Sequence, residues 1–142
     1  VEIQGIASPL LLLRPFRHPG VSAITYTRDG RKLVTTAAQP GVVRLWDAQT
    51  GKELAPPIRL EPGITGATFS LDGKRVMTAG TGGSVKVWDA ASGQELFALA
   101  VNPNGLSRLA LSPDGKLLGT ASDDGTLEIV TLDIDGLLRL PR

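Results

Sequence analysis

Apolar and polar residues alternate along short runs of this chain, and the clearest run is Val85–Asp89, which reads Val-Lys-Val-Trp-Asp. The same pattern occurs 42 positions earlier, in Val43–Asp47. It occurs again 42 positions later in a divergent copy, Leu127–Thr131, in which Val130 replaces tryptophan. Alternation of this kind predicts half-buried β-strands. Its fixed period indicates a repeat architecture.

Each repeat carries further landmarks in the same order. An Asp-Gly pair lies between two short apolar runs, and such a pair favours a tight hairpin because glycine accepts a positive φ. A strand end led by threonine follows, at Thr36, Thr78 and Thr120, and then a glycine-containing turn. We therefore predict four antiparallel strands per repeat, a to d, with strand d at 54–60, 95–101 and 137–140. The Asp-Gly aspartates are Asp29, Asp72 and Asp114.

The opening residues align with the end of a repeat, with 1–5 as a strand c and 10–16 as a strand d. We therefore expect one unit over residues 1–142, divided into a half repeat at 1–17 and full repeats at 18–60, 61–101 and 102–142. Position 1 is valine and the chain opens in the middle of a repeat. We expect an excerpt from a longer chain.

These motifs resemble those of the WD-repeat β-propeller family. The resemblance is carried by Phe69–Lys74, Leu111–Lys116, Ala121–Thr126 and the two Trp-Asp strands. It implies an all-β fold of four-stranded antiparallel blades, about three and a half of them, in an open, incomplete ring. The linkers Arg17–Gly20 and Pro56–Arg59 look like those of bacterial propellers. The resemblance therefore implies a place in a bacterial signalling protein, and we expect a cytoplasmic location.

The family links its strands through a buried tetrad of a histidine before strand a, a strand-b Ser or Thr, a turn aspartate and the strand-c tryptophan. The resemblance puts Arg17 or His18 in the histidine slot of the first full repeat, and Leu60 and Asn102 in the next two. The turn aspartate remains only at Asp124. No repeat holds all four residues, so apolar packing is expected to carry more of each blade. Structural roles are expected for Trp46, Asp47, Trp88, Asp89, Asp29, Asp72, Asp114 and Asp124.

Composition narrows the function. The chain has 142 residues, a net charge of +1 and no cysteine. This balance gives no electrostatic reason to expect nucleic acid or an anionic membrane as a partner. No apolar run approaches the ~20 residues that span a bilayer. Disulfides and thiolate metal sites are excluded.

Candidate chemistry is sparse. His18 is the only histidine, and one imidazole without a second ligand does not make a familiar zinc site. Gly80–Gly83 lacks the lysine of a P-loop and precedes a strand, so a hairpin turn is favoured. Asp123 and Asp124 lack the ligand spacing of a calcium loop and are interpreted as turn residues. No catalytic residue, cofactor or metal is predicted.

We expect a non-catalytic scaffold that binds a protein partner or a neighbouring domain through loops on one rim. Two alternatives stay open. One is a structural segment that completes a ring or associates with itself through open blade faces. The other is an enzyme on a propeller scaffold, for which strand a offers only hydroxyls, at Ser22, Thr25, Thr65 and Ser107. The rim candidates are Arg17, His18, Gln39, Glu61, Thr81, Asn102, Asn104 and Asp123.

Overall fold

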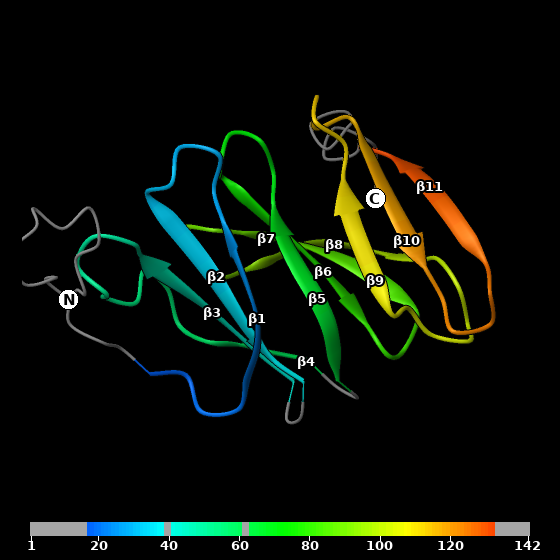
Figure 1. The fold of residues 1–142 in the computed structure, drawn as a ribbon, viewed down its shortest axis with the longest axis horizontal. Coiled ribbons are helices and arrows are strands. Elements are labelled where there is room, and N and C mark those ends of the chain that lie inside the picture. Colours follow the sequence, from blue (N-terminus) through cyan, green and yellow to red (C-terminus); the bar gives the residue numbers. More distant parts are fainter. Residues whose placement is uncertain (1–16, 39–40, 61–62, 133–142) are drawn as a thin grey trace, which may run out of the picture.

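The computed structural model describes residues 17–38, 41–60 and 63–132. Within these ranges the protein is all-β, without a helix, and forms three antiparallel sheets side by side (Figure 1). We call the sheets blades 1, 2 and 3. None of them closes into a barrel, which agrees with the predicted open, partial propeller. The predicted half repeat at 1–17 falls almost entirely outside the described residues, as does the strand at 137–140.

The strands follow the chain in simple meanders, so that each blade is an up-and-down sheet. Blade 1 contains β1 (Val21–Tyr26), β2 (Lys32–Ala37), β3 (Gly41–Asp47) and β4 (Ile58–Leu60). Blade 2 contains β5 (Ile64–Phe69), β6 (Arg75–Gly80), β7 (Ser84–Asp89) and β8 (Glu95–Ala100). The described part of blade 3 contains β9 (Arg108–Leu111), β10 (Leu117–Ala121) and β11 (Leu127–Thr131).

The Asp-Gly turns form the first hairpin of each blade, as predicted. In blade 1 the Asp29 carboxylate accepts hydrogen bonds from the Thr27 hydroxyl at 2.7 Å and from the Arg31 amide at 2.9 Å. Gly30 takes a φ of 73°, which glycine tolerates without steric cost. Ser70 with Asp72, and Ser112 with Asp114, repeat the same hydroxyl-to-carboxylate bond at 2.6 Å.

The aspartates that follow the tryptophans order the turn after strand c. Asp47 accepts hydrogen bonds from the amides of Gln49 and Thr50 at 2.9 and 3.0 Å. Asp89 accepts from the amide and the hydroxyl of Ser92 at 3.3 and 2.7 Å. Side-chain bonds of this type stabilise a local turn. Both aspartates therefore stabilise the turn that follows strand c.

Apolar residues from successive blades pack together between the sheets. One buried cluster joins Val34, Val43 and Leu45 of blade 1 to residues of blade 2 that include Ile64 and Phe69. A second cluster joins Ala79 and Val85 of blade 2 to Leu106 and Leu118 on the blade 3 side. A single sheet cannot cover both of its own faces, so each blade depends on its neighbour for burial.

The structure corrects two details of the predicted register. Strand d of blade 1 begins at Ile58 rather than at residue 54. Pro56 and Pro57 precede it, and proline has no amide hydrogen for the strand ladder. The threonine that faces the strand-c tryptophan in blade 1 is Thr35, the residue before the repeated threonine at position 36. Thr35 and Trp46 are 11 residues apart, whereas Thr78 and Trp88 are 10 apart, so the β2–β3 turn contains one extra residue.

Candidate interaction surface

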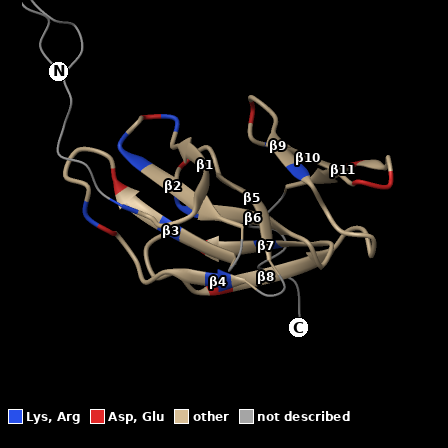
Figure 2. Cartoon of the chain, turned by 60° about the horizontal axis from the view of Figure 1, so that its bottom comes forward, with Lys and Arg blue, Asp and Glu red and all other residues tan. Residues whose placement is uncertain are grey.

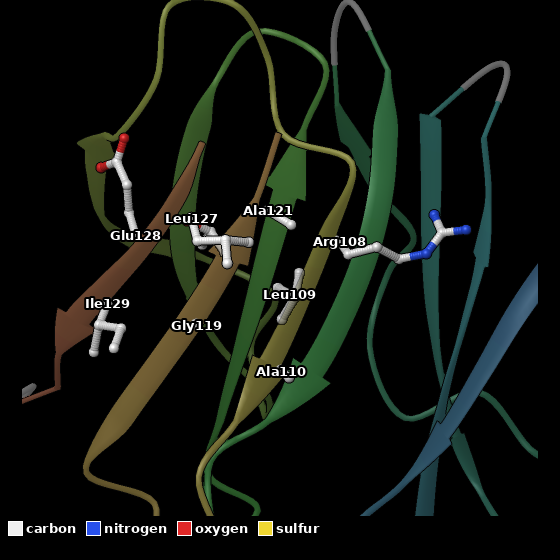
Figure 3. Close-up of a pocket in the computed structure, with 9 residues that line it drawn as sticks. Arg108, Leu109, Ala110, Gly119, Ala121, Leu127, Glu128 and Ile129 are labelled. Atoms are coloured by element: carbon white, nitrogen blue, oxygen red, sulfur yellow. The ribbon is translucent and has the colours of Figure 1, made fainter. Parts of the chain in front are cut away.

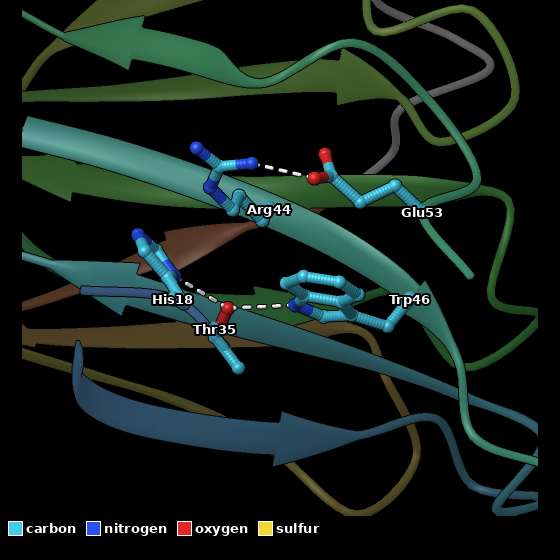
Figure 4. Close-up of polar contacts among 5 residues, drawn as sticks. All are labelled: His18, Thr35, Arg44, Trp46 and Glu53. Atoms are coloured by element: carbon cyan, nitrogen blue, oxygen red, sulfur yellow. Dashed lines mark hydrogen bonds and ion pairs between the residues drawn. The ribbon is translucent and has the colours of Figure 1, made fainter. Parts of the chain in front are cut away.

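Blade 1 holds three members of the expected buried tetrad. Thr35 Oγ1 accepts a hydrogen bond from Trp46 Nε1 at 2.8 Å and lies 2.7 Å from His18 Nδ1 (Figure 4). The threonine hydroxyl has two lone pairs and one proton, so besides the indole bond it accepts from His18 Nδ1 in one imidazole tautomer and donates to it in the other. His18 therefore occupies the histidine slot, and Arg17 is exposed.

The surroundings of His18 disfavour its charged form. The imidazole is 9 % exposed. Burial lowers the pKa of His18, and the nearby Arg44 cation lowers it further, while Glu53 opposes both effects. Arg44 and Glu53 form an ion pair with each other (Figure 4). The His18 side chain is thus a buried group in the hydrogen-bond network of blade 1.

Blade 2 keeps only the tryptophan and threonine of the tetrad. Trp88 Nε1 donates to Thr78 Oγ1 at 3.0 Å. Leu60, the residue predicted for the histidine slot, is buried in the apolar cluster between blades 1 and 2. A cavity of about 160 Å³ lies beside Thr78 and is also lined by Leu60, Gly82 and Lys86. Among residues 41–60 and 63–132, the polar link of blade 2 therefore stops at the threonine.

Blade 3 replaces the tetrad with a polar link at the rim. The Thr120 hydroxyl is buried and has no hydrogen-bond partner among the described residues, since Val130 stands in the place of tryptophan. Asp124 instead accepts hydrogen bonds from Asn102 Nδ2 at 3.2 Å and from Asn104 Nδ2 at 3.0 Å. We call Asn102, Asn104 and Asp124 the Asn–Asp clamp. It ties the loop between β8 and β9 to the turn between β10 and β11.

Two more contacts stiffen the Asn–Asp clamp. The Asn104 amide donates to Asn102 Oδ1 at 2.9 Å, and the Thr126 amide donates to Asp124 Oδ1 at 2.8 Å. Hydrogen bonds from Thr126, Asn104 and Asn102 hold the pKa of the Asp124 carboxyl well below its usual range. Asp124 is therefore an ionised acceptor under all ordinary conditions.

The structure gathers four of the predicted rim residues at one edge. Thr81, Asn102, Asn104 and Asp123 lie on the turns and the loop where blades 2 and 3 meet. Thr81, Asn104 and Asp123 are exposed, whereas Asn102 is 6 % exposed and serves the Asn–Asp clamp. Arg17 and His18 lie on blade 1, directly before β1. Gln39 and Glu61 fall outside the described residues.

Comparison with known families decides the classification. The family model for the WD domain, G-beta repeat, matches residues 11–47, 59–89 and 93–130, which together make up more than half of the chain. The chain belongs to this family. A search of curated proteins found no match. WD repeats generally mediate protein–protein interaction and typically act as non-catalytic scaffolds.

The WD repeats are offset from the blades. The second matched stretch starts at residue 59, within β4 of blade 1, and ends at residue 89, the last residue of β7 in blade 2. The third starts at 93, just before β8, and ends at 130 in β11. Each of these stretches therefore contains all or part of the last strand of one blade and the strands of the next blade. One sequence repeat thus spans the boundary between two blades.

The inner strands of the WD blades carry hydroxyls that serve structure. The hydroxyls of Ser22, Thr65 and Ser107 each donate to a backbone carbonyl of the adjacent strand at 3.1 Å. Beside them is a hollow of about 590 Å³, whose lining includes Arg108. Arg108 was not among the predicted site residues, although its charge within an inner strand is visible in the sequence. Arg108 Nη1 donates to the Ser107 carbonyl at 2.8 Å.

The described residues of the WD blades contain no group of three or more His, Cys, Asp or Glu side chains placed to hold a metal ion. Nor does the described part of the chain include a helix long and apolar enough to cross a membrane.

Proposed function

We propose that this protein is a non-catalytic scaffold whose docking surface is the edge where blades 2 and 3 meet. We call this edge the docking rim and define it by Thr81, Asn104 and Asp123. The observation that carries the proposal is the Asn–Asp clamp, in which Asp124 holds Asn102 and Asn104 at 3.2 and 3.0 Å. A loop that is ordered before binding loses less conformational entropy when a partner docks.

The backbone around the docking rim is also tightly packed. The amides of Val101 and Asn102 both donate to the Gly83 carbonyl, at 2.9 and 3.1 Å, and the Leu106 amide donates to the Gly80 carbonyl at 3.3 Å. These bonds join the β6–β7 turn to the β8–β9 loop. Exposed side chains at the docking rim are therefore held on a fixed frame, which suits specific recognition.

The chemistry of the docking rim indicates what a partner must offer. Acidic residues cluster at the β10–β11 end of the molecule (Figure 2), where Asp123 and Asp124 are exposed. The Asn104 side chain adds an amide. A partner segment that presents lysine, arginine or backbone amides would complement this surface, and such complementarity governs specificity and association rate.

A comparative pull-down tests the docking rim. The chain is immobilised and exposed to a lysate of its source organism, with brief crosslinking. The rim variant Asn104→Lys/Asp123→Lys is compared with a control, Arg28→Glu/Lys116→Glu, on the Asp-Gly turns at the opposite ends of the strands. Proteins that bind the wild type and the control but not the rim variant support the proposal. Partners that bind all three chains equally contradict it.

We extend the proposal to a bacterial, cytoplasmic signalling protein as the setting of this scaffold. Its support is the resemblance of the linkers Arg17–Gly20 and Pro56–Arg59 to those of bacterial propellers. Reading the coding sequence on both sides of the chain tests this extension, because an adjacent kinase or signalling ATPase module is the expected result. Flanking sequence of another kind would contradict it without affecting the docking rim.

A further inference from the structure

Both asparagines of the chain lie in one loop, between β8 and β9. Asn102 begins a tight turn, in which the Gly105 amide donates to the Asn102 carbonyl at 3.0 Å and the Asn104 amide donates to Asn102 Oδ1 at 2.9 Å. Pro103 follows Asn102, whereas Gly105 follows Asn104. The two asparagines therefore share a turn but differ in the residue that comes next.

The fold requires glycine at position 105. Gly105 has a φ of 90°, and a Cβ at this position would lie 2.8 Å from the Thr81 carbonyl oxygen. The obstacle is backbone and not a flexible side chain, so any other residue would force the loop to shift. The close approach of the β6–β7 turn to the β8–β9 loop thus places a glycine directly after Asn104.

An Asn-Gly pair is the sequence in which asparagine loses its side-chain amide most readily. The backbone nitrogen of the next residue attacks the side-chain carbonyl carbon and closes a cyclic imide, and the side-chain nitrogen leaves as ammonia with the proton of the attacking nitrogen. Water then opens the imide at either carbonyl, which gives aspartate or isoaspartate. Glycine leaves the attacking nitrogen unshielded. The nitrogen of Pro103 carries no proton to lose, so Asn102 is blocked where Asn104 is not.

In the folded chain both reacting groups are held by other partners. The Asn104 side-chain amide donates to Asp124 Oδ2 at 3.0 Å, and the Gly105 amide donates to the Asn102 carbonyl. Imide closure brings the Asn104 side-chain carbon onto the Gly105 nitrogen, and this movement competes with both hydrogen bonds. The Asn–Asp clamp therefore opposes the reaction for as long as it is closed.

The strands on either side hold Asp124 in place. Ala121, the last residue of β10, pairs with Arg108 of β9 on one side and with Leu127 of β11 on the other (Figure 3). This register brings the turn after Ala121 and the loop before Arg108 to the same edge of blade 3. The Asp124 carboxylate thus meets the Asn104 amide on a frame that is fixed by the sheet.

The product of the reaction would reverse this contact. Aspartate or isoaspartate at position 104 has no side-chain N–H to donate, and its carboxylate would face the ionised carboxylate of Asp124. Two carboxylates at hydrogen-bond distance repel each other. Within the clamp only Asn102 Nδ2, at 3.2 Å, would still donate to Asp124.

We propose that Asn104 is a deamidation site, that Asp124 controls its rate, and that the deamidated loop leaves the Asn–Asp clamp. The net reaction exchanges one water for one ammonia and needs no other co-reactant. It adds one negative charge to the edge where blades 2 and 3 meet. Its effect on a partner rests on the docking rim proposed above, whereas the chemistry of Asn104 does not.

Peptide mapping by mass spectrometry, during prolonged incubation in mildly alkaline buffer, tests the site and its control. The mass change of deamidation should map to Asn104, with Asn102 as the internal control. Asp124→Ala should react at least about tenfold faster than the wild type, because a hydrogen bond to a charged group is lost. Asp123→Ala should react at the wild-type rate. Equal rates in the wild type and Asp124→Ala, or no reaction in either, would overturn the proposal.

Hydrogen exchange tests the product without using Asp124→Ala, so it holds even where that variant does not fold. Asn104→Asp reproduces one product, and Asn104→Ala removes the donor without adding charge. The amides of the β8–β9 loop should exchange faster in Asn104→Asp than in the wild type, and the excess over Asn104→Ala measures the repulsion from Asp124. Loop protection in Asn104→Asp equal to that of the wild type would show that deamidation leaves the clamp closed, and would overturn that part of the proposal.

Discussion

Thr78 and Thr120 occupy the same place in successive blades, yet only Thr78 has a side-chain partner. Thr78 Oγ1 accepts from Trp88 Nε1 at 3.0 Å, whereas the Thr120 hydroxyl is buried without a partner in the described part of the chain. The two threonines therefore offer a matched test of what the buried hydrogen bond contributes. Both side chains are buried, at 1 % exposed for Thr78 and 4 % for Thr120.

We predict opposite results for the two threonine-to-valine substitutions. Thr78→Val leaves the indole N–H of Trp88 without an acceptor, and the free energy of unfolding should fall by about 1–3 kcal/mol. Thr120→Val removes an unpaired hydroxyl and should leave stability unchanged or raise it. Urea unfolding measures both values. Equal losses in the two variants would contradict the assignment of the hydrogen bond.

The single histidine predicts a dependence of stability on pH. The pKa of His18 is lowered in the folded chain from its ordinary value of 6.5, chiefly by burial. The unfolded chain therefore binds the proton first, so the free energy of unfolding should be highest above pH ~7 and should decrease as the pH falls through 6.5 towards the folded pKa. Urea unfolding over this range gives the slope. His18→Gln, compared over the same range, should remove most of it, and an unchanged slope would place the titration elsewhere.

The Asn–Asp clamp predicts a local effect on dynamics. Asp124→Ala removes the acceptor of Asn102 and Asn104, so the amides of the β8–β9 loop should exchange faster with solvent. Hydrogen exchange followed by mass spectrometry measures this change. The control is Asp123→Ala, at the exposed neighbouring position, which should leave exchange of that loop as in the wild type. Equal protection in Asp124→Ala would mean that the backbone alone orders the loop.

Two glycines predict different costs for the same substitution. Gly83 and Gly125 have nearly equal φ values of 87° and 88°. The Cβ of Gly125→Ala meets no atom within 4 Å. The free energy of unfolding should therefore fall only through the left-handed backbone conformation, by about 1–2 kcal/mol. Gly83→Ala would place its Cβ 1.7 Å from the Asn102 carbonyl oxygen, so the backbone must move as well and the loss should be clearly larger. Thermal unfolding of both variants tests this difference, and equal melting temperatures would contradict it.

Several parts of the fold could be predicted from residues alone because they depend on local chemistry. Asp29 and Gly30 form their turn through contacts within a few residues. The alternation in Val85–Asp89 indicates a strand with one buried face and one more polar face. The Asn–Asp clamp could not be predicted in the same way. Asn102, Asn104 and Asp124 were all singled out, but their hydrogen bonds join residues 20 and 22 positions apart, and nothing local indicates that pairing.

Periodicity and the conformations that Asp-Gly pairs favour are enough to predict the repeat, the strand order within a blade and the turns. The remaining features depend on how the strands and blades pack together. With one extra residue in the β2–β3 turn, Thr35 rather than Thr36 accepts the hydrogen bond of Trp46 Nε1, which a fixed period does not reveal. Leu127 and Val85 have the same place in the pattern, but only Val85 is covered by another blade. Whether an apolar side chain is buried depends on a neighbouring sheet, and alternation along a strand carries no information about that neighbour.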